Sequence, residues 1–401
     1  MARMPNANLA PADVAVAVDE VLRATPFVDI HTHLFPASFG RLLLWGIDEL
    51  LTYHYLEAEL FRFNHIRPEQ YWALTAPQRA DLIWKTLFVD HSPVSEATRG
   101  AVAVLSAFGL DAGATSLEPY RAFFRRQELA AHIQRVFELA GVSEVVMTND
   151  PLDPEEAPLW ESGLLPEAGF RAALRLDRVL NDAAWTDADA RRLLETWSRR
   201  MKPAYMAVSL PDAFTFPADD HRTRLLREAV LPVCRELGLP LSLMIGVRRQ
   251  VNPALRSAGD ASGRADLRAL EALCTGFPDN RFLVSVLSRE NQHELCVYAR
   301  KFSNLVPFGC WWFLNNPSIV EEITRERLEM LGTSFIPQHS DARILEQLIY
   351  KWRNTRRTLA PILTRAYRTL AEDGGAVTRA GIERDVRRLF RGNFEAFAAS
   401  R

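Results

Sequence analysis

The sequence predicts an α/β protein built as a closed (β/α)8 barrel, and two observations lead to that expectation. Eight short runs rich in apolar and β-branched residues recur along the chain, and from about residue 144 they alternate with helical patterns. Near-continuous apolar runs are typical of parallel strands that are buried on both faces. Polar residues also follow these runs, at the strand ends where an α/β barrel keeps its active site.

The eight predicted strands are each five or six residues long. In chain order they are Pro26–Ile30, Glu144–Asn149, Arg171–Leu176, Tyr205–Ser209, Pro240–Ile245, Phe282–Leu287, Leu305–Cys310 and Thr333–Gln338. Eight strand–helix units favour a closed barrel over an open sheet. Two helical stretches, Ile344–Ala371 and Thr378–Phe397, are expected to complete the barrel after the last strand.

The connection between the first two strands is unusually long. It has helical patterns at Phe39–Ala58, Pro68–Val89, Val94–Phe108, Ser116–Arg126 and Glu128–Ala140. Long connections inside a domain are usually functional. We therefore expect one barrel domain spanning residues 1–401, with residues 38–140 forming a helical insertion over the C-terminal face of the barrel.

The composition argues against several classes of function. The chain has 401 residues, 48% hydrophobic and 24% charged, with a net charge of −2, which is ordinary for a globular protein. No global basic field attracts nucleic acid or anionic lipid. Neither a membrane-spanning run nor the apolar core of a signal peptide is present, which predicts a cytoplasmic location without membrane association. The four cysteines form no Cys-x-x-Cys motif and are expected to be buried apolar residues.

The tripeptide His31-Thr32-His33 directly follows the first predicted strand. Side chains alternate along a strand, so His31 and His33 point the same way and can grip one metal ion. Asp341, after the eighth predicted strand, supplies a carboxylate in a similar context. Two imidazoles and a carboxylate, with open positions left over, form a workable catalytic zinc site. Two alternatives remain open: the histidines lie on the surface, or Asp341 caps the helix that begins near Ile344.

Two arginines are candidates for binding an anion. Arg175 lies inside an apolar run, where a charge is costly unless it is paired. It is either an ion-pair partner of Asp177 or Asp29, or it binds an anionic substrate through its guanidinium fork. Arg343 lies two residues beyond Asp341 and offers a second fork. Together they indicate a carboxylate or phosphate ligand.

Other aromatic and histidine residues carry weaker signals. Taken alone, Tyr53-His54-Tyr55 in the insertion indicates ordinary helix packing. Trp311 and Trp312 are expected at the barrel mouth, where one of them can stack on a sugar. His339, like His293, is more typical of a satisfied polar residue than of a metal ligand.

Taken together, these motifs resemble the uronate isomerase branch (glucuronate/galacturonate isomerase) of the amidohydrolase superfamily. The resemblance covers roughly residue 15 to the C-terminus and is strongest toward a divergent bacterial group. The motifs that carry it are Val28-Asp29-Ile30 with the His pair, Asp48-Glu49-Leu50, Leu51-Thr52-Tyr53-His54-Tyr55, Thr148-Asn149-Asp150-Pro151, Ala173-Leu174-Arg175-Leu176-Asp177, Ser288-Arg289-Glu290-Asn291-Gln292-His293, Gly309-Cys310-Trp311-Trp312-Phe313 and Ser340-Asp341-Ala342-Arg343.

The resemblance implies a distorted (β/α)8 TIM barrel with one divalent metal, most often Zn²⁺. The substrate is a hexuronate sugar acid, isomerised from D-glucuronate to D-fructuronate or from D-galacturonate to D-tagaturonate, and a homo-oligomer is a possible assembly. The residues that it implies are His31, His33 and Asp341 as metal ligands, and Tyr55, Arg175 and Arg343 as substrate contacts, with His33 and His54 also at the substrate.

The reaction moves a proton from C2 to C1 through a cis-enediol, for which Asp341 suits the base and Tyr55 the proton shuttle between O1 and O2. Met244 stands where such isomerases carry a strand-five histidine, and Ser209-Leu210 replaces an aspartate–histidine pair. A metal site with few ligands favours proton transfer over hydrolysis. Two rivals remain: a metal-dependent hydrolase or decarboxylase acting on a small carboxylate, and a sugar-acid-binding protein without metal.

Overall fold

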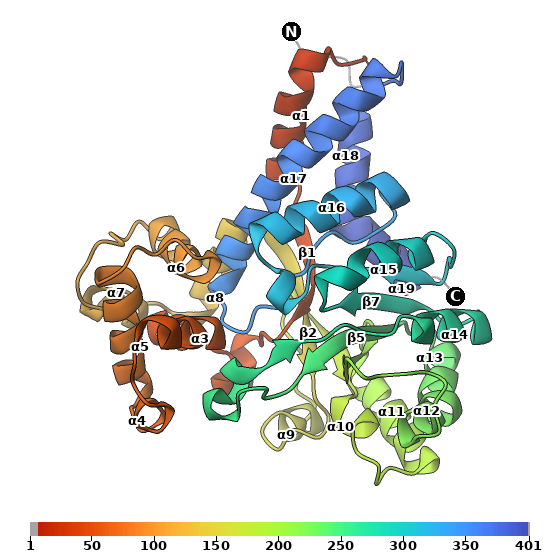
Figure 1. Ribbon diagram of the computed structural model, residues 1–401, viewed down its shortest axis with the longest axis horizontal. Helices are drawn as coiled ribbons and strands as arrows, with labels where there is room; N and C mark the ends of the chain where they lie inside the picture. The colour runs from red at the N-terminus through yellow and green to blue at the C-terminus, as the bar shows by residue number, and fades with distance from the viewer. Residues whose placement is uncertain (1–6, 400–401) are drawn as a thin grey trace.

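A computed structural model describes residues 7–399 and contains a curled, mostly parallel sheet (Figure 1). Its strands are β1 (Phe27–Thr32), β2 (Val142–Asn149), β3 (Phe170–Arg175), β4 (Met206–Pro211), β5 (Leu241–Arg248), β6 (Ala261–Ser262), β7 (Phe282–Val286) and β8 (Leu305–Pro307). The order is β1-β2-β3-β4-β5-β7-β8, all parallel, and the short β6 pairs antiparallel with β5. The first seven predicted strands are confirmed, with altered ends.

The prediction of an eighth strand at Thr333–Gln338 is wrong. This segment forms only one parallel bridge, between Phe308 and Ile336, and the sheet is not closed into a barrel. Pro337 has no N–H to donate to a strand ladder, which explains why pairing stops there. Beyond the proline, the chain reaches β1 through a backbone bond from the Asp341 N–H to the His31 carbonyl at 3.1 Å. The predicted α/β class with a curled parallel sheet is confirmed.

Between β1 and β2 the chain is helical. The elements are η1 (Ala37–Leu42), α2 (Ile47–Leu51), α3 (His54–Phe63), α4 (Pro68–Trp72), α5 (Ala76–Trp84), η2 (Lys85–Val89), α6 (Glu96–Ala107), α7 (Glu118–Arg125) and α8 (Leu129–Ala140). The predicted single helix Phe39–Ala58 is wrong, because Gly46 (φ 95°) and Tyr53 in extended backbone divide it. Tyr53 therefore directly precedes α3, and His54 is the first residue of that helix. In Figure 1, α3 to α7 stand beside the sheet.

The remaining helices flank the sheet or lie at the chain ends. They are α1 (Pro11–Ala24), α9 (Ala157–Glu161), α10 (Asp177–Leu180), α11 (Asp187–Met201), α12 (His221–Leu225), η3 (Leu226–Val230), α13 (Leu231–Leu237), η4 (Pro253–Gly259), α14 (Arg268–Gly276), η5 (Arg289–Asn291), α15 (Gln292–Ala299), η6 (Trp312–Leu314), α16 (Pro317–Leu331), α17 (Gln347–Glu372), α18 (Arg379–Arg387), η7 (Arg388–Gly392) and α19 (Asn393–Ala399). The two predicted C-terminal helical stretches correspond to α17 and to the run from α18 to α19. Helices α1, α17 and α18 project together from the sheet (Figure 1).

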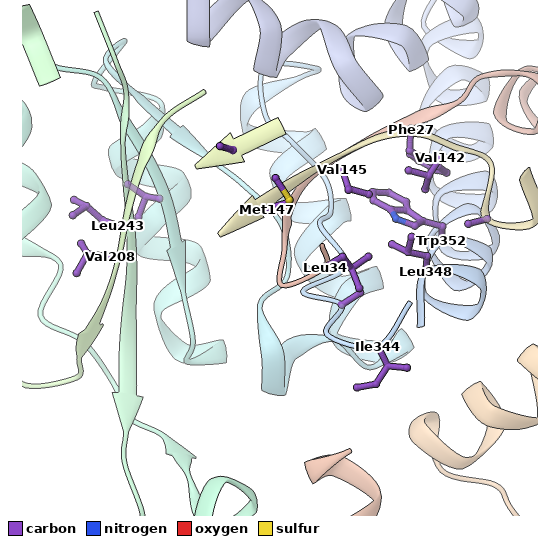
Figure 2. Close-up of a cluster of buried hydrophobic side chains, with 14 of the residues drawn as sticks. Phe27, Leu34, Val142, Val145, Met147, Val208, Leu243, Ile344, Leu348 and Trp352 are labelled. Atoms are coloured by element: carbon purple, nitrogen blue, oxygen red, sulfur yellow. The ribbon is translucent and has the colours of Figure 1, made fainter. Parts of the chain in front are cut away.

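Helix α17 is anchored to the first strand by aromatic packing. The Phe27 ring of β1 lies 4.0 Å from the Trp352 ring of α17 and 3.8 Å from the Phe390 ring. Figure 2 shows Phe27, Leu348 and Trp352 in this cluster. Burying an aromatic side chain contributes roughly 1.5–3 kcal/mol, so this contact stabilises the packing of α17 against β1. All four cysteines are buried, as expected. Within residues 7–399, no helix has both the length and the apolar character needed to cross a membrane.

A glycine next to the bridge at Phe308 leaves room for a buried histidine. Gly309 has φ +64°, and a Cβ there would lie 1.9 Å from the Cδ2 atom of His339. We expect Gly309→Ala to lower the free energy of unfolding by about 2–5 kcal/mol, from backbone strain and overpacking together. Gly238→Ala is the matched control, because Gly238 has the same φ of +64° with nothing within 4 Å; it is expected to cost only about 1–2 kcal/mol. Equal losses in urea denaturation would contradict the steric explanation.

Candidate metal centre and active site

A cavity of about 110 Å³ lies at the carboxyl ends of the strands. Such a space has the volume of a few water molecules, about 30 Å³ each. The residues that line it are His31, His33, Tyr53, His54, Arg175, Ser209, Arg249, Ser257, Asp260, Trp311, Trp312, Asp341 and Arg343. The structure thus brings together all the sequence-predicted site residues except Tyr55.

His31, His33 and Asp341 form a compact group of potential ligands. One ligand atom from each lies within 4.8 Å of the other two. The Nε2 atoms of His31 and His33 lie 3.5 and 3.3 Å from the same Asp341 oxygen, Oδ1. His31 and Asp341 are buried and His33 is partly buried. Two imidazole nitrogens and one carboxylate oxygen suit a divalent metal of the transition series and leave coordination positions open.

The protonation of His33 matches that of a metal ligand. Burial lowers the pKa of His33 to about 4, so its ring is neutral near pH 7. The Thr148 hydroxyl donates to the Thr32 carbonyl at 2.7 Å and lies 2.8 Å from His33 Nδ1. Because its proton is already used, the hydroxyl accepts from Nδ1–H. This fixes the tautomer in which the Nε2 lone pair faces Asp341, as metal binding requires.

Asp341 is held in an unusual backbone conformation. Its φ is +52°, in the left-handed region that non-glycine residues seldom occupy. Burial raises the pKa of its carboxyl, but the interactions with the His31 and His33 rings outweigh burial and leave that pKa well below its usual value. The carboxylate is therefore ionised. The alternative function as a helix cap is not found, because α17 begins at Gln347 and its N-cap is Glu346.

The two arginines differ in their partners. Arg175 Nε donates to Asp177, whose other oxygen accepts the Ser209 N–H at 3.1 Å. The predicted ion pair with Asp177 is thus confirmed. Arg343, by contrast, forms no ion pair with any residue in 7–399 and lies in the cavity wall. Its guanidinium is available to an anionic ligand.

The aromatic residues at the start of α3 approach the cavity from the insertion. Burial lowers the pKa of His54 to about 3, so its ring is neutral, and its buried Nε2 has no hydrogen-bond partner among the described residues. Tyr53 lines the cavity, whereas Tyr55 lies behind it with a ring centroid 4.9 Å from that of Tyr53. The buried Tyr55 hydroxyl also has no partner within residues 7–399.

Sequence reasoning missed the contribution of the loop after β5. Arg249 Nη1 lies 2.6 Å from Asp260 Oδ2, and both residues line the cavity with Ser257. Arg249 directly follows β5 and lies only four residues beyond the predicted fifth strand, which was an available signal, whereas Asp260 had no such signal. A second cavity of about 370 Å³ adjoins the first and shares Arg175, Ser209 and Arg249 with it.

Trp311, Trp312 and His339 lie at or next to the cavity. Trp311 and Trp312 both line the cavity, as expected for residues at the barrel mouth. The expectation that His339 is a satisfied polar residue is wrong. It is fully buried, and within residues 7–399 neither ring nitrogen has a partner. The rings of His31 and His339 lie 5.1 Å apart, so His339 packs directly behind a potential ligand.

The metal centre is testable by replacing its donors. His31→Ala and His33→Ala each remove one imidazole, and we expect the bound divalent metal to fall well below one equivalent after purification, as measured by elemental analysis. His65 is exposed and does not line the cavity, so His65→Ala is the control that is expected to keep its metal. Full metal occupancy in both site variants would rule out this assignment.

Solved structures include clear relatives of this chain. A uronate isomerase from Bacillus halodurans C-125 is 46% identical, with 98% of each chain covered and a TM-score of 0.95. A uronate isomerase from Thermotoga maritima is 16% identical, with 99% of each chain covered and a TM-score of 0.76. A glucuronate isomerase from Caulobacter crescentus is 17% identical over 98% of this chain and 95% of that chain, with a TM-score of 0.74.

At their low identity, the second and third relatives share the fold alone. No protein-family model and no functionally curated protein matches the chain. The first relative carries the assignment, because 46% identity extends over 98% of both chains. The chain therefore belongs to the uronate isomerase family.

Proposed function

We propose that this protein catalyses the aldose–ketose isomerisation of a hexuronate, D-glucuronate to D-fructuronate or D-galacturonate to D-tagaturonate. The observation that carries the proposal is one cavity that combines His31, His33 and Asp341 with Arg343, an arginine that has no ion-pair partner within residues 7–399. The first three offer a metal and a base, and the arginine offers a partner for a carboxylate. Membership of the uronate isomerase family supports the same conclusion.

The metal in this proposal is Zn²⁺, held by His31, His33 and Asp341. The donor set fits, because neutral imidazole and carboxylate are ordinary zinc ligands and three protein donors leave positions for substrate. When bound, Zn²⁺ supplies positive charge that orients and polarises the oxygens of the sugar acid. The hydrogen bond from His33 to Thr148 holds that imidazole in its ligating tautomer.

Proton transfer is assigned to Asp341 and Tyr55. The ionised carboxylate of Asp341 removes the proton from C2 and returns it to C1, with a cis-enediol in between. A proton also moves between O2 and O1, and Tyr55 is proposed as its carrier. Tyr53 lines the cavity and its ring centroid lies 4.9 Å from that of Tyr55, so the Tyr53 hydroxyl is proposed as the relay between Tyr55 and the substrate. The neutral His54 ring faces the same space and offers a hydrogen bond to the substrate.

The carboxylate of the sugar acid is assigned to Arg343 and Arg175. Arg343 forms no ion pair within residues 7–399, and Arg175 uses Nε for Asp177, which leaves its terminal nitrogens for another acceptor. The adjoining cavity beyond Arg175 and Arg249 supplies room that the 110 Å³ space lacks. We also propose that the fold is a distorted barrel of the amidohydrolase type in one domain, with residues 38–140 as its helical insertion. Two backbone hydrogen bonds support that reading, one from the Asp341 N–H to the His31 carbonyl at 3.1 Å and one from the His33 N–H to the Ala342 carbonyl at 2.7 Å.

Hydrolysis has less support than isomerisation. A hydrolase of this kind uses further ligands to activate water, but the equivalent strand positions hold Ser209 and Met244. Met244 is buried within an apolar cluster that includes Val146 and Leu283. Among residues 7–399, only the three-residue group was found as a potential metal centre.

The proton-transfer assignment predicts unequal losses in two variants. Asp341→Asn keeps the shape but removes the base, so kcat is expected to fall about 10²–10⁴-fold. Tyr55→Phe removes one hydroxyl, and we expect a loss of about 10²-fold with unchanged zinc content. If both residues serve one proton path, the double variant is less impaired than the product of the single losses. An Asp341→Asn protein with wild-type activity would refute the mechanism.

The carboxylate assignment predicts a defect that charge alone does not repair. We expect Arg343→Ala to lower kcat/KM for the uronate by an amount equivalent to about 2–4 kcal/mol of transition-state stabilisation, because a bidentate contact to a charged group disappears. Arg343→Lys restores the charge but not the fork, so we expect only partial recovery. Arg178, an exposed arginine paired with Asp150, provides the control variant Arg178→Ala. Unchanged kinetics in both Arg343→Ala and Arg175→Ala would place the carboxylate elsewhere.

A further inference from the structure

A buried lysine lies directly behind the candidate active site. Lys351 is in the second turn of α17 and is only 3% exposed. The six consecutive residues from Gln347 to Trp352 are all buried, so this part of α17 is enclosed on every side. Long charged side chains are almost never fully buried unless they are paired. The position of this ammonium group therefore calls for an explanation.

The ammonium group is bonded to the loop that carries Asp341. Lys351 Nζ donates to the Ser340 carbonyl at 2.6 Å. This carbonyl belongs to the peptide unit that enters Asp341, the residue with φ +52°. A hydrogen bond from a charged donor is roughly twice as strong as a neutral one. The bond therefore opposes relaxation of Asp341 toward a commoner backbone conformation.

The same group also faces the aromatic residue assigned as proton carrier. Lys351 Nζ lies 5.5 Å from the centroid of the Tyr55 ring. A cation over a ring face at this distance is attracted to it, more strongly where water is excluded. Lys351 is thus one side chain that contacts both the Asp341 loop and Tyr55, which come from opposite ends of the chain.

No ion pair within residues 7–399 explains the burial of Lys351. The acidic groups that act on it are Glu96, Asp341 and Asp29, and none lies within ion-pair distance. The Asp29 oxygens are used by the Ser340 N–H at 3.0 Å and by Trp352 Nε1 at 2.8 Å. Burying a charged group without an acidic partner is energetically costly. Such a cost is retained where the group serves a site.

We propose that Lys351 is a positioning residue of the active site, which holds the Asp341 loop in its ligating conformation through the Ser340 carbonyl and orients Tyr55 through its ring. The second part, the orientation of Tyr55, rests on the proposed function. The first part concerns metal binding and stands independently of the reaction.

The test compares two variants of Lys351 with one on the same helix. Lys351→Met removes the charge and the donor but keeps the length, whereas Lys351→Gln keeps an N–H donor without the charge. Arg356→Met is the matched control: Arg356 lies five residues further along α17 and also donates to backbone carbonyls, those of Leu22, Ala140 and Gly141, away from the cavity. Zinc affinity is measured by chelator competition, and kcat and KM are measured at saturating zinc.

For Lys351→Met, we expect zinc affinity to fall about 10–100-fold, the usual effect of losing a group that supports a ligand. At saturating zinc, kcat is expected to fall by at least a similar factor while KM changes little, because Asp341 and Tyr55 act on the proton and not on binding. Lys351→Gln recovers part of the zinc affinity. Arg356→Met lowers the melting temperature but leaves zinc affinity and kcat unchanged.

Wild-type zinc affinity and kcat in Lys351→Met would overturn the proposal, whatever the melting temperature. If Lys351→Met does not fold, Lys351→Gln decides by the same criteria. Equal losses in Arg356→Met and the Lys351 variants would also overturn it, because the effect would then be general destabilisation. If the wild-type protein isomerises no uronate, the proposed function fails, and the zinc measurement alone decides on Lys351.

Discussion

The structure depends on the buried carboxylate of Asp29. This side chain of β1 accepts hydrogen bonds from the Ser340 N–H at 3.0 Å and from Trp352 Nε1 at 2.8 Å. It thereby ties the first strand to a loop 311 positions away and to helix α17. Burial raises the pKa of its carboxyl, and hydrogen bonds from Ser340 and Trp352 oppose that shift. Removing a buried acceptor with several donors would strand those donors, at about 1–3 kcal/mol each.

The consequences of this junction extend to the candidate metal centre. His31 is two residues from Asp29, and Asp341 is one residue from Ser340. The Asp29 carboxylate therefore sets the spacing between the candidate metal ligands His31 and Asp341, which come from opposite ends of the chain. The Asp341 N–H donates to the His31 carbonyl at 3.1 Å, and Lys351 Nζ donates to the Ser340 carbonyl at 2.6 Å. These bonds hold Asp341 at a positive φ, a strained conformation that the surrounding structure maintains.

The parts of the fold that depend on local patterns could be predicted from the sequence. Seven strands follow from apolar runs, and the shared face of His31 and His33 follows from strand alternation. The prediction of an eighth strand was wrong because Pro337, which cannot donate a backbone hydrogen bond, interrupts an otherwise apolar run. The helix predicted over Phe39–Ala58 failed for a similar reason, since backbone geometry at Gly46 and Tyr53 decides it.

Contacts between distant segments explain what remained hidden in the site. Asp260 enters the cavity because the chain turns back after β5 and pairs with Arg249, which no periodicity encodes. The residue pattern alone does not distinguish Tyr53 from Tyr55. Tyr53 lies in the cavity wall because of the way the chain enters α3. Lys351 resembles any lysine of an amphipathic helix until the packing of α17 encloses it.

The most direct test of the account is proton NMR of D-glucuronate and D-galacturonate incubated with the zinc-loaded protein in D₂O. Transfer from C2 to C1 through Asp341 predicts a ketose with deuterium at C1, because a proton held on a carboxyl group exchanges in part with solvent. Aldoses that remain unchanged, with protium retained at C2, in a protein that binds one equivalent of zinc would contradict the isomerase assignment.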